Sequence, residues 1–272
     1  MSRLSVIQLA SGPEVPANLA VAGELLTEAQ GQGAAVALLP ENFAFMGRGE
    51  ADRRAVAEPD GSGPMQAFLA ETARRLRLWI IAGTIPLKSS AGDGRTTNTC
   101  LVYSASGERV ARYDKIHLFD VDVPGKRERY HESASVAPGS ECVVVDTPVG
   151  VVGLSVCYDV RFPELYRRLI EQGAELLVVP SAFTTPTGRA HWETLLRARA
   201  IENLCYVAAA AQSGIHASGR ETYGDSMIVD YWGRVLVRLP RGRGVVSANV
   251  DRQSQAAARA QFPSLNHRVL RS

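Results

Sequence analysis

Cys157 is the side chain of this sequence best placed for nucleophilic chemistry. It ends an apolar, β-prone run over 151–156, and a turn with the charged pair Asp159 and Arg161 follows before Pro163 opens a helical pattern. A cysteine between a strand and a helix presents its thiol at the strand tip, and the next backbone N–H groups point to where a substrate oxygen could sit. The alternative is inert packing, which is common for a buried cysteine.

Two ionisable side chains also follow predicted strands. Glu41 comes directly after Pro40, which ends a buried strand over 35–39. Partial desolvation at that position should raise the pKa of Glu41 toward the range useful for a general base. Lys115 lies at a strand end in the segment YDKIHLFD, with both apolar and acidic neighbours, and could place a positive charge on a developing oxyanion. Taken alone, Glu41 could be an ordinary loop acid and Lys115 a surface salt-bridge residue.

A long polar segment follows Lys115. Residues 114–140 show little periodic pattern, which is typical of a functional loop. Glu132 is the other carboxylate in this loop with comparable turn chemistry around it, although alone it would hardly be noticed.

Signals for metals and common cofactors are missing from the sequence. Five histidines are spread along the chain, and no HExxH or paired-cysteine pattern occurs, so we expect no metal. No Walker loop, no GxGxxG after a strand and no G-x-S-x-G elbow occurs either. His191 opens a predicted helix, and this position favours a packing or capping role for its side chain. Cys100, Cys142 and Cys205 lie inside apolar runs, which favours packing for each.

Composition excludes several classes of protein. The chain has 272 residues, 46% hydrophobic and 21% charged, which suits a globular protein with a substantial core and argues against disorder. A net charge of +2 gives no strong attraction to nucleic acid or an acidic membrane. No apolar run reaches the length of a membrane span, and the opening run over 4–9 predicts a buried strand. Scattered cysteines suit a reducing compartment, so we expect a cytoplasmic protein.

Hydrophobic periodicity predicts two similar halves. Strands are expected over 4–9, 35–39, 79–85, 98–103, 109–113, 143–146, 151–156, 176–179, 205–210, 226–229 and 235–238, and helices over 17–30, 65–76, 163–172 and 191–203. The pattern Gln-Gly-Ala, strand, Pro-x-x-Phe begins at Gln32 and again at Gln172. Such a repeat fits two sheets packed face to face with helices outside, related by a pseudo-twofold axis. Chance similarity between two βα units is the alternative.

Three segments resemble the catalytic motifs of the carbon–nitrogen hydrolases of the nitrilase superfamily. They are LPENF around Glu41, KIHLFDVDVPGK around Lys115 and GLSVCYDVRFPELYR around Cys157, in the order of that family. The resemblance covers nearly the whole chain, so it implies one domain over 1–272 with a C-terminal tail from about 252. It also implies an α/β fold, a four-layer α-β-β-α sandwich with an internal pseudo-twofold, as the repeat suggests independently.

The resemblance implies a role for each motif residue. Cys157 would be the nucleophile, Glu41 its general base and Lys115 the stabiliser of the tetrahedral oxyanion, with the backbone N–H of Tyr158 completing the oxyanion hole. Glu132 would orient Lys115 or relay protons. Attack on the primary amide of a small keto-acid-type substrate would give a Cys thioester, with release of ammonia and then hydrolysis by water, and neither a metal nor a cofactor is needed.

Arg161 is expected to form a structural ion pair. The family commonly forms dimers, which makes Leu165, Tyr166 and the tail over 262–270 candidates for a homodimer interface.

The resemblance also narrows the substrate class. The tract over 187–233 resembles the branch that hydrolyses deaminated glutathione, and the neighbouring alternatives are an ω-amidase acting on α-ketoglutaramate and a carbamoylase. Both keto-acid substrates carry a carboxylate. Groups after the strand that ends at Pro180 could bind them; these are Phe183, Thr184, Thr185, Thr187 and, for the carboxylate, Arg189. A turn or surface role is the alternative for each.

Two further hypotheses belong to different classes. The chain could be a catalytically silent binding or scaffold protein, although the presence of Glu41, Lys115, Glu132 and Cys157 weakens that reading. Cys157 could also be a redox-sensing thiol, because an activated thiolate is easily oxidised.

Overall fold

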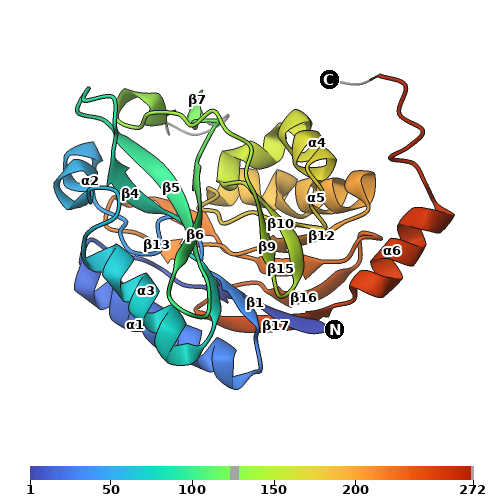
Figure 1. Ribbon diagram of the computed structural model, residues 1–272. Coiled ribbons are helices and arrows are strands. Elements are labelled where there is room, and N and C mark those ends of the chain that lie inside the picture. Colours follow the sequence, from blue (N-terminus) through green and yellow to red (C-terminus); the bar gives the residue numbers. More distant parts are fainter. Residues whose placement is uncertain (123–128, 271–272) are drawn as a thin grey trace.

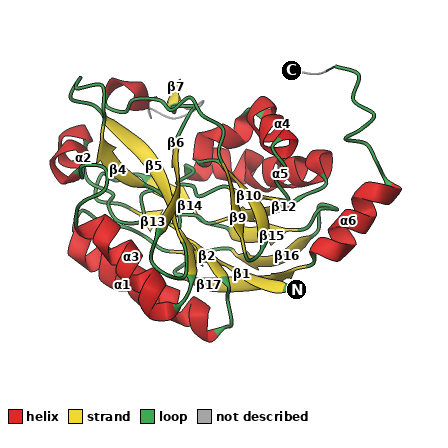
Figure 2. Cartoon of the chain, viewed as in Figure 1, coloured by secondary structure: helices red, strands yellow, loops and turns green. Residues whose placement is uncertain are grey.

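Two mixed β-sheets pack face to face in the computed structural model, which describes residues 1–122 and 129–270 (Figure 1). The first sheet has the order β17-β1-β2-β3-β5-β4, with β6 beside β5, and the second has the order β16-β15-β12-β11-β10-β9. Helices cover the two outer faces, which gives the predicted four-layer α-β-β-α sandwich (Figure 2). None of the helices in the described ranges is long and apolar enough to cross a membrane.

The two halves have the same plan. In the first sheet β1, β2 and β3 run parallel and the antiparallel hairpin β5–β6 follows; in the second, β10, β11 and β12 run parallel and the hairpin β15–β16 follows. The first-sheet strands are β1 (Ser2–Gln8), β2 (Val36–Leu38), β3 (Trp79–Ile81), β4 (Ile85–Lys88), β5 (Thr96–Tyr103), β6 (Arg109–Asp114) and β17 (Gly244–Val250). Those of the second are β9 (Val144–Thr147), β10 (Gly150–Leu154), β11 (Leu176–Val178), β12 (Tyr206–Ala209), β15 (Ser226–Val229) and β16 (Val235–Leu239). The predicted internal repeat is therefore confirmed.

The helices lie outside the sheets. They are α1 (Val15–Gly31), α2 (Glu50–Val56), α3 (Pro64–Leu76), α4 (Pro163–Glu171), α5 (Thr185–Asn203) and α6 (Arg252–Gln261). Helices α1 and α3 cover the first sheet and α4 and α5 the second (Figure 1). One buried cluster joins the facing sheets, with Val6 and Leu38 on one side and Leu154 and Val178 on the other. Burial of these branched side chains from both sheets holds the sandwich together.

Some predicted elements need correction. The strand expected over 79–85 divides into β3 and β4, because the chain turns at Gly83 with φ +55°. Helix α5 begins at Thr185, six residues before the predicted start, since Pro186 fits the first helical turn, where no N–H donor is required. Strand β17 was not predicted, and it pairs with β1 at the opposite end of the sequence.

The loop predicted over 114–140 carries more structure than expected. It contains the short strands β7 (Asp120–Asp122) and β8 (Arg129–His131) and a 3-10 turn, η1 (Glu132–Ala134). A second short pair, β13 (Ser213–Ile215) and β14 (Glu221–Tyr223), also escaped prediction, as did α2. Each is short, so local periodicity had little signal to offer.

Gly83 is required by its surroundings. A Cβ at this position would collide with the carbonyl oxygen of Pro40, directly before Glu41. We therefore expect Gly83→Ala to lower the free energy of unfolding by more than about 3 kcal/mol in urea titrations. Gly92 is a matched control, because it also has positive φ but nothing lies near a Cβ there. Gly92→Ala should cost only about 1 kcal/mol, and equal losses for the two variants would contradict the steric argument.

Candidate active site

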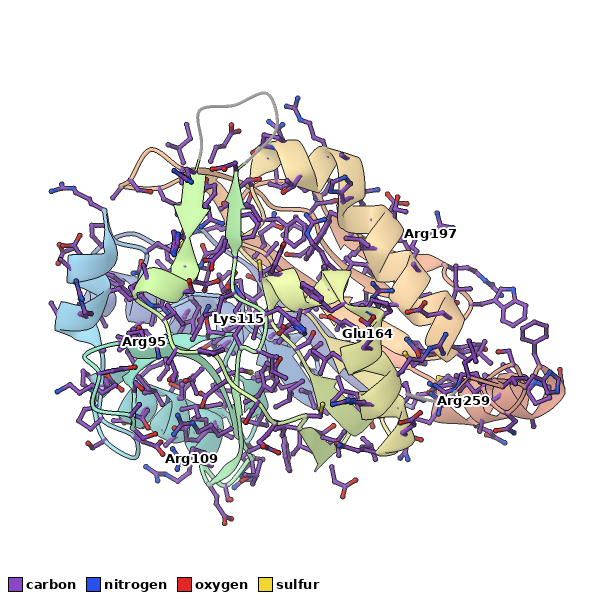
Figure 3. All side chains as sticks on the ribbon, turned by 90° about the horizontal axis from the view of Figure 1, so that it is seen from above. Arg95, Arg109, Lys115, Glu164, Arg197 and Arg259 are labelled. Atoms are coloured by element: carbon purple, nitrogen blue, oxygen red, sulfur yellow. The ribbon has the colours of Figure 1, made fainter. Side chains whose placement is uncertain are left out.

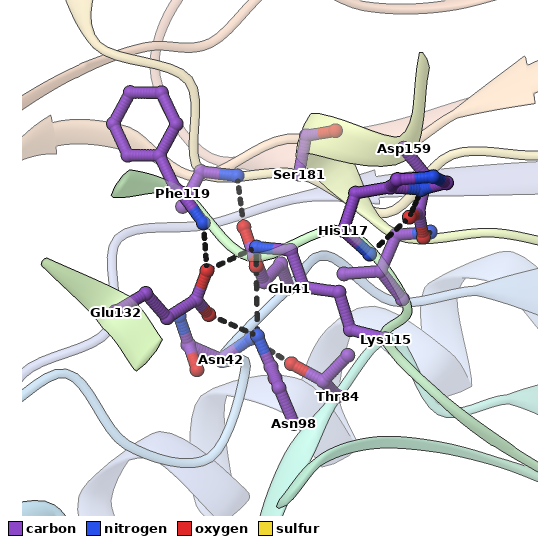
Figure 4. Close-up of polar contacts among 12 residues, drawn as sticks. Glu41, Asn42, Thr84, Asn98, Lys115, His117, Phe119, Glu132, Asp159 and Ser181 are labelled. Carbon is purple, nitrogen blue, oxygen red and sulfur yellow. Dashed lines mark hydrogen bonds and ion pairs between the residues drawn. The ribbon is translucent and has the colours of Figure 1, made fainter. Parts of the chain in front are cut away.

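Glu41 lies just beyond the end of β2, and the residue is 3% exposed. One carboxylate oxygen accepts hydrogen bonds from Lys115 Nζ at 3.1 Å and from Asn98 Nδ2 at 2.9 Å. The other accepts the backbone N–H of Ala182 at 2.9 Å, from the second half of the chain (Figure 4). The carboxylate is therefore held in one orientation by partners from both halves.

Lys115 follows β6 and lies between two carboxylates. Its Nζ is 3.1 Å from Glu41 and 2.9 Å from Glu132, and the side chain is 2% exposed. Figure 3 places Lys115 well inside the molecule, whereas Arg109, Arg197 and Arg259 lie toward its edges. Burial alone would lower the pKa of Lys115, but the charges of Glu132 and Glu41 outweigh it and the pKa is raised. The lysine is therefore held as a cation.

Glu132 opens η1 and completes this cluster. It accepts the backbone N–H of Phe119 at 2.7 Å as well as the Lys115 ammonium. Burial opposes its ionisation, but Lys115 lowers its pKa below the usual value. Asn98, from the middle of β5, donates its amide to both Glu41 and Glu132 and bridges them (Figure 4). Asn98 was not identified as a site residue from the sequence. The one feature that could have indicated it is its polar side chain within an otherwise strand-forming run.

Cys157 begins the 3-10 turn η2 (Cys157–Arg161) after β10. Its φ is +51°, a left-handed conformation that is uncommon for a residue other than glycine and is typical of functional sites. Its N–H donates to the carbonyl of Pro180 at 2.9 Å. Burial and the charge of the Glu41 carboxylate raise the pKa of the Cys157 thiol, and the charge of Lys115 opposes them. The proton therefore stays on sulfur until Glu41 can take it.

Asp159 anchors this turn from within. It is fully buried, and its carboxylate accepts the backbone N–H of Val156 at 2.8 Å and the Tyr113 hydroxyl at 2.7 Å. It also binds the backbone N–H and the ring of His117, two residues after Lys115 (Figure 4). One carboxylate thus ties the segment of the nucleophile to the segment of the lysine.

A cavity of about 390 Å³ opens beside these groups. Its lining includes the four predicted catalytic side chains and Tyr158, together with Phe183, Thr184 and Thr187. Thr185 and Arg189, also predicted to bind substrate, are not part of the lining, and Arg189 is exposed on α5. The reason is the early start of α5, which carries these two positions around the helix and away from the cavity.

Arg161 differs from its predicted role. Its guanidinium lies 5.7 Å from the ring centre of Tyr158 and 5.3 Å from that of Phe183, and it is 3.2 Å from His191 Nδ1. No carboxylate pairs with it in the described ranges, so the predicted ion pair is wrong. Because Arg161 also lines the cavity, its charge is available to an anionic ligand.

Residues 3–260 match the family model for carbon–nitrogen hydrolases. The chain belongs to the carbon–nitrogen hydrolase family. This carbon–nitrogen hydrolase is 41% identical over 266 residues to the deaminated glutathione amidase of Yersinia enterocolitica, an alignment that covers 98% of this chain and 92% of that one. It is 43% identical over 267 residues to the deaminated glutathione amidase of Synechocystis, with 97% of each chain covered.

A solved structure shows the same fold. Saccharomyces cerevisiae Nit3, a member of branch 10 of the nitrilase superfamily, superposes with a TM-score of 0.86 at 29% identity, over 96% of this chain and 94% of the yeast protein. The resemblance inferred from the three motifs is confirmed. Over its described residues, this carbon–nitrogen hydrolase has no group of three or more His, Cys, Asp or Glu arranged to hold a metal ion.

The raised thiol pKa predicts how the resting enzyme reacts. Since burial and Glu41 disfavour the thiolate, alkylation of Cys157 by iodoacetamide should accelerate about tenfold per pH unit between pH 7 and 9. The rate can be followed by mass spectrometry of the Cys157 peptide, with the Cys157→Ala variant used to subtract labelling elsewhere. A plateau reached below pH 8 would mean that the thiolate already predominates and that the argument is wrong.

Proposed function

We propose that this enzyme is an amidase that hydrolyses the C–N bond of deaminated glutathione through a thioester at Cys157. The observation that supports the chemistry most directly is the Lys115 ammonium 3.1 Å from the Glu41 carboxylate, in a cavity that Cys157 also lines. The names of its bacterial relatives support the substrate.

The reaction proceeds in two halves. Glu41 takes the thiol proton as sulfur attacks the amide carbonyl, and the oxyanion is stabilised by Lys115 Nζ and the N–H of Tyr158. The tetrahedral intermediate collapses, the C–N bond breaks, and Glu41 returns the proton to the leaving nitrogen. Glu41 then activates a water molecule, which hydrolyses the thioester and releases the acid and the free thiol. Glu132 positions Lys115 and takes no proton in this sequence.

The leaving group follows from the substrate. In deaminated glutathione the scissile bond is a secondary amide, so its products are α-ketoglutarate and cysteinylglycine. The sequence predicted ammonia as the product, but ammonia is released only from a primary amide such as α-ketoglutaramate. Both substrates have the same acyl group, which carries a carboxylate. We assign the binding of this carboxylate to Arg161 and the Thr187 hydroxyl, on the side of the cavity where Phe183 lies. α-Ketoglutarate is therefore the product to measure.

We further propose that the enzyme acts in the cytoplasm as a homodimer on small-molecule amides, without nucleic acid or membrane as partners. A nucleophilic thiol favours a reducing compartment, and all four cysteines are free. Leu165 and Tyr166 are buried within the chain and cannot supply the interface as predicted. The exposed side chains of Phe262, Val269 and Leu270 keep the tail as the candidate.

Removal of either reacting group should abolish turnover. We expect Cys157→Ala and Glu41→Gln each to lower kcat at least about 1,000-fold, and the double variant to be no worse than either, because the two residues act as a unit. Cys142→Ala is the matched control, since that cysteine lies outside the cavity. Circular dichroism would check folding. Retained activity in Cys157→Ala would exclude the thioester mechanism and bring back the scaffold hypothesis.

Substrate preference can be measured with one product. We expect kcat/KM for α-ketoglutarate release to be ~100-fold higher with deaminated glutathione than with α-ketoglutaramate, about 2.7 kcal/mol of transition-state discrimination. The reverse preference would make the enzyme an ω-amidase. An N-carbamoyl amino acid included in the same assay would reveal a carbamoylase.

A further inference from the structure

A groove lined with arginines opens outward from the catalytic cavity. Its volume is about 560 Å³, and its lining includes Arg48, Arg53, Arg129 and Arg220 but, over the described residues, no Asp or Glu. The same four arginines also border the catalytic cavity, so the two spaces adjoin. We call this space the outer groove. Its charge favours an anion, and the chemistry at Cys157 requires none of these four side chains.

Three of the four arginines, Arg53, Arg129 and Arg220, already contact other groups of the protein. Arg129 forms an ion pair with Asp122 at 3.1 Å, and Arg53 donates to the Asn42 side chain at 2.8 Å. Arg48 is exposed, and its guanidinium has no ion-pair partner in the described ranges. Arg220 lies over the Tyr130 ring at 5.0 Å, and its Nε is buried with no hydrogen-bond partner among the described residues. A buried donor without a partner is costly unless a ligand supplies the acceptor.

The outer groove begins beside the general base. Arg53 contacts Asn42, the residue after Glu41, and Arg220 donates to the carbonyl of Ala182, whose own N–H holds the Glu41 carboxylate. Glu41 must deliver its proton to the nitrogen of the leaving group, so the leaving group lies next to Glu41. Arg161, assigned above to the acyl carboxylate, borders the cavity but not the outer groove. The leaving group and the acyl group therefore face different arginines.

We propose that the outer groove is a leaving-group subsite in which Arg220 and Arg48 bind a carboxylate at the far end of a peptide-like amine. The inference rests on the proposed function. Two extended residues span about 7 Å, which carries the C-terminal carboxylate of cysteinylglycine out of the cavity and into this space. Guanidinium and carboxylate form bidentate, charge-assisted hydrogen bonds. α-Ketoglutaramate has no such carboxylate, so this subsite selects substrates with an acidic leaving group.

Binding to Cys157→Ala, which cannot turn over, tests the subsite by calorimetry. The probes are deaminated glutathione and its analogue with the glycine carboxylate converted to an amide. We expect the carboxylate form to bind about tenfold more tightly, and this ratio to fall to about threefold or less when Arg48→Gln or Arg220→Gln is added. Arg54→Gln, on α2 but outside both spaces, is the control and should keep the full ratio. A ratio near one in Cys157→Ala, or one that neither variant lowers, would overturn the proposal.

Two details keep this test separate from the proposed function. Arg220 also braces the Ala182 carbonyl, whereas Arg48 is exposed, so Arg48→Gln reports on the subsite even if Arg220→Gln fails to fold. Turnover of both probes by the unmodified enzyme is measured in parallel. Equal turnover of the two probes with equal binding would retain the amidase and refute the subsite. Binding that depends on the carboxylate, without any turnover, would place a carboxylate site in the outer groove but refute both the proposed function and the leaving-group role.

Discussion

The ammonium of Lys115 between Glu41 and Glu132 is the interaction on which the site depends. A buried cation without partners would be very costly, and removing one partner from such a pair leaves an uncompensated charge, typically at a cost of 3–5 kcal/mol. Here the two contacts lie at 3.1 and 2.9 Å, and the remaining carboxylate oxygens are satisfied, that of Glu41 by the N–H of Ala182 and that of Glu132 by the amide of Asn98. One charge cluster therefore holds the end of β2, the end of β6 and η1 together.

Each charged group of this cluster has a separate role in catalysis. Burial and the Glu41 carboxylate raise the pKa of the Cys157 thiol, so the proton stays on sulfur until Glu41 takes it. Lys115 stays cationic because two carboxylates surround it, which leaves a fixed positive charge for an oxyanion. Glu132 orients the Lys115 ammonium, and Asn98 orients the Glu132 carboxylate by donating a hydrogen bond to it. Little reorganisation is required during the reaction, because these dipoles and charges are already in place.

The duplicated architecture explains why the site lies between the halves. The first half supplies Glu41 and Lys115 from strand ends, and the second supplies Cys157 and the N–H of Ala182. Burial of branched side chains between the sheets brings these strand ends together. Asp159 makes the alignment specific, because its carboxylate binds both the turn of the nucleophile and the backbone of His117.

The sequence by itself determined the local features of this protein. Glu41, Lys115 and Cys157 could be singled out because each lies shortly after a strand, and the resemblance of the surrounding motifs to carbon–nitrogen hydrolases supplied their expected roles. The repeated Pro-x-x-Phe pattern predicted the two-sheet sandwich. Only the tertiary structure decided which side chains meet across long separations. It brought Asn98 to both glutamates, paired β17 with β1 and placed Arg220 beside the backbone that holds Glu41. Among the described residues it also gave Arg161 no carboxylate partner. The physical reason is that hydrogen bonding and charge compensation depend on distance in space, whereas periodicity reports only which face of an element is buried.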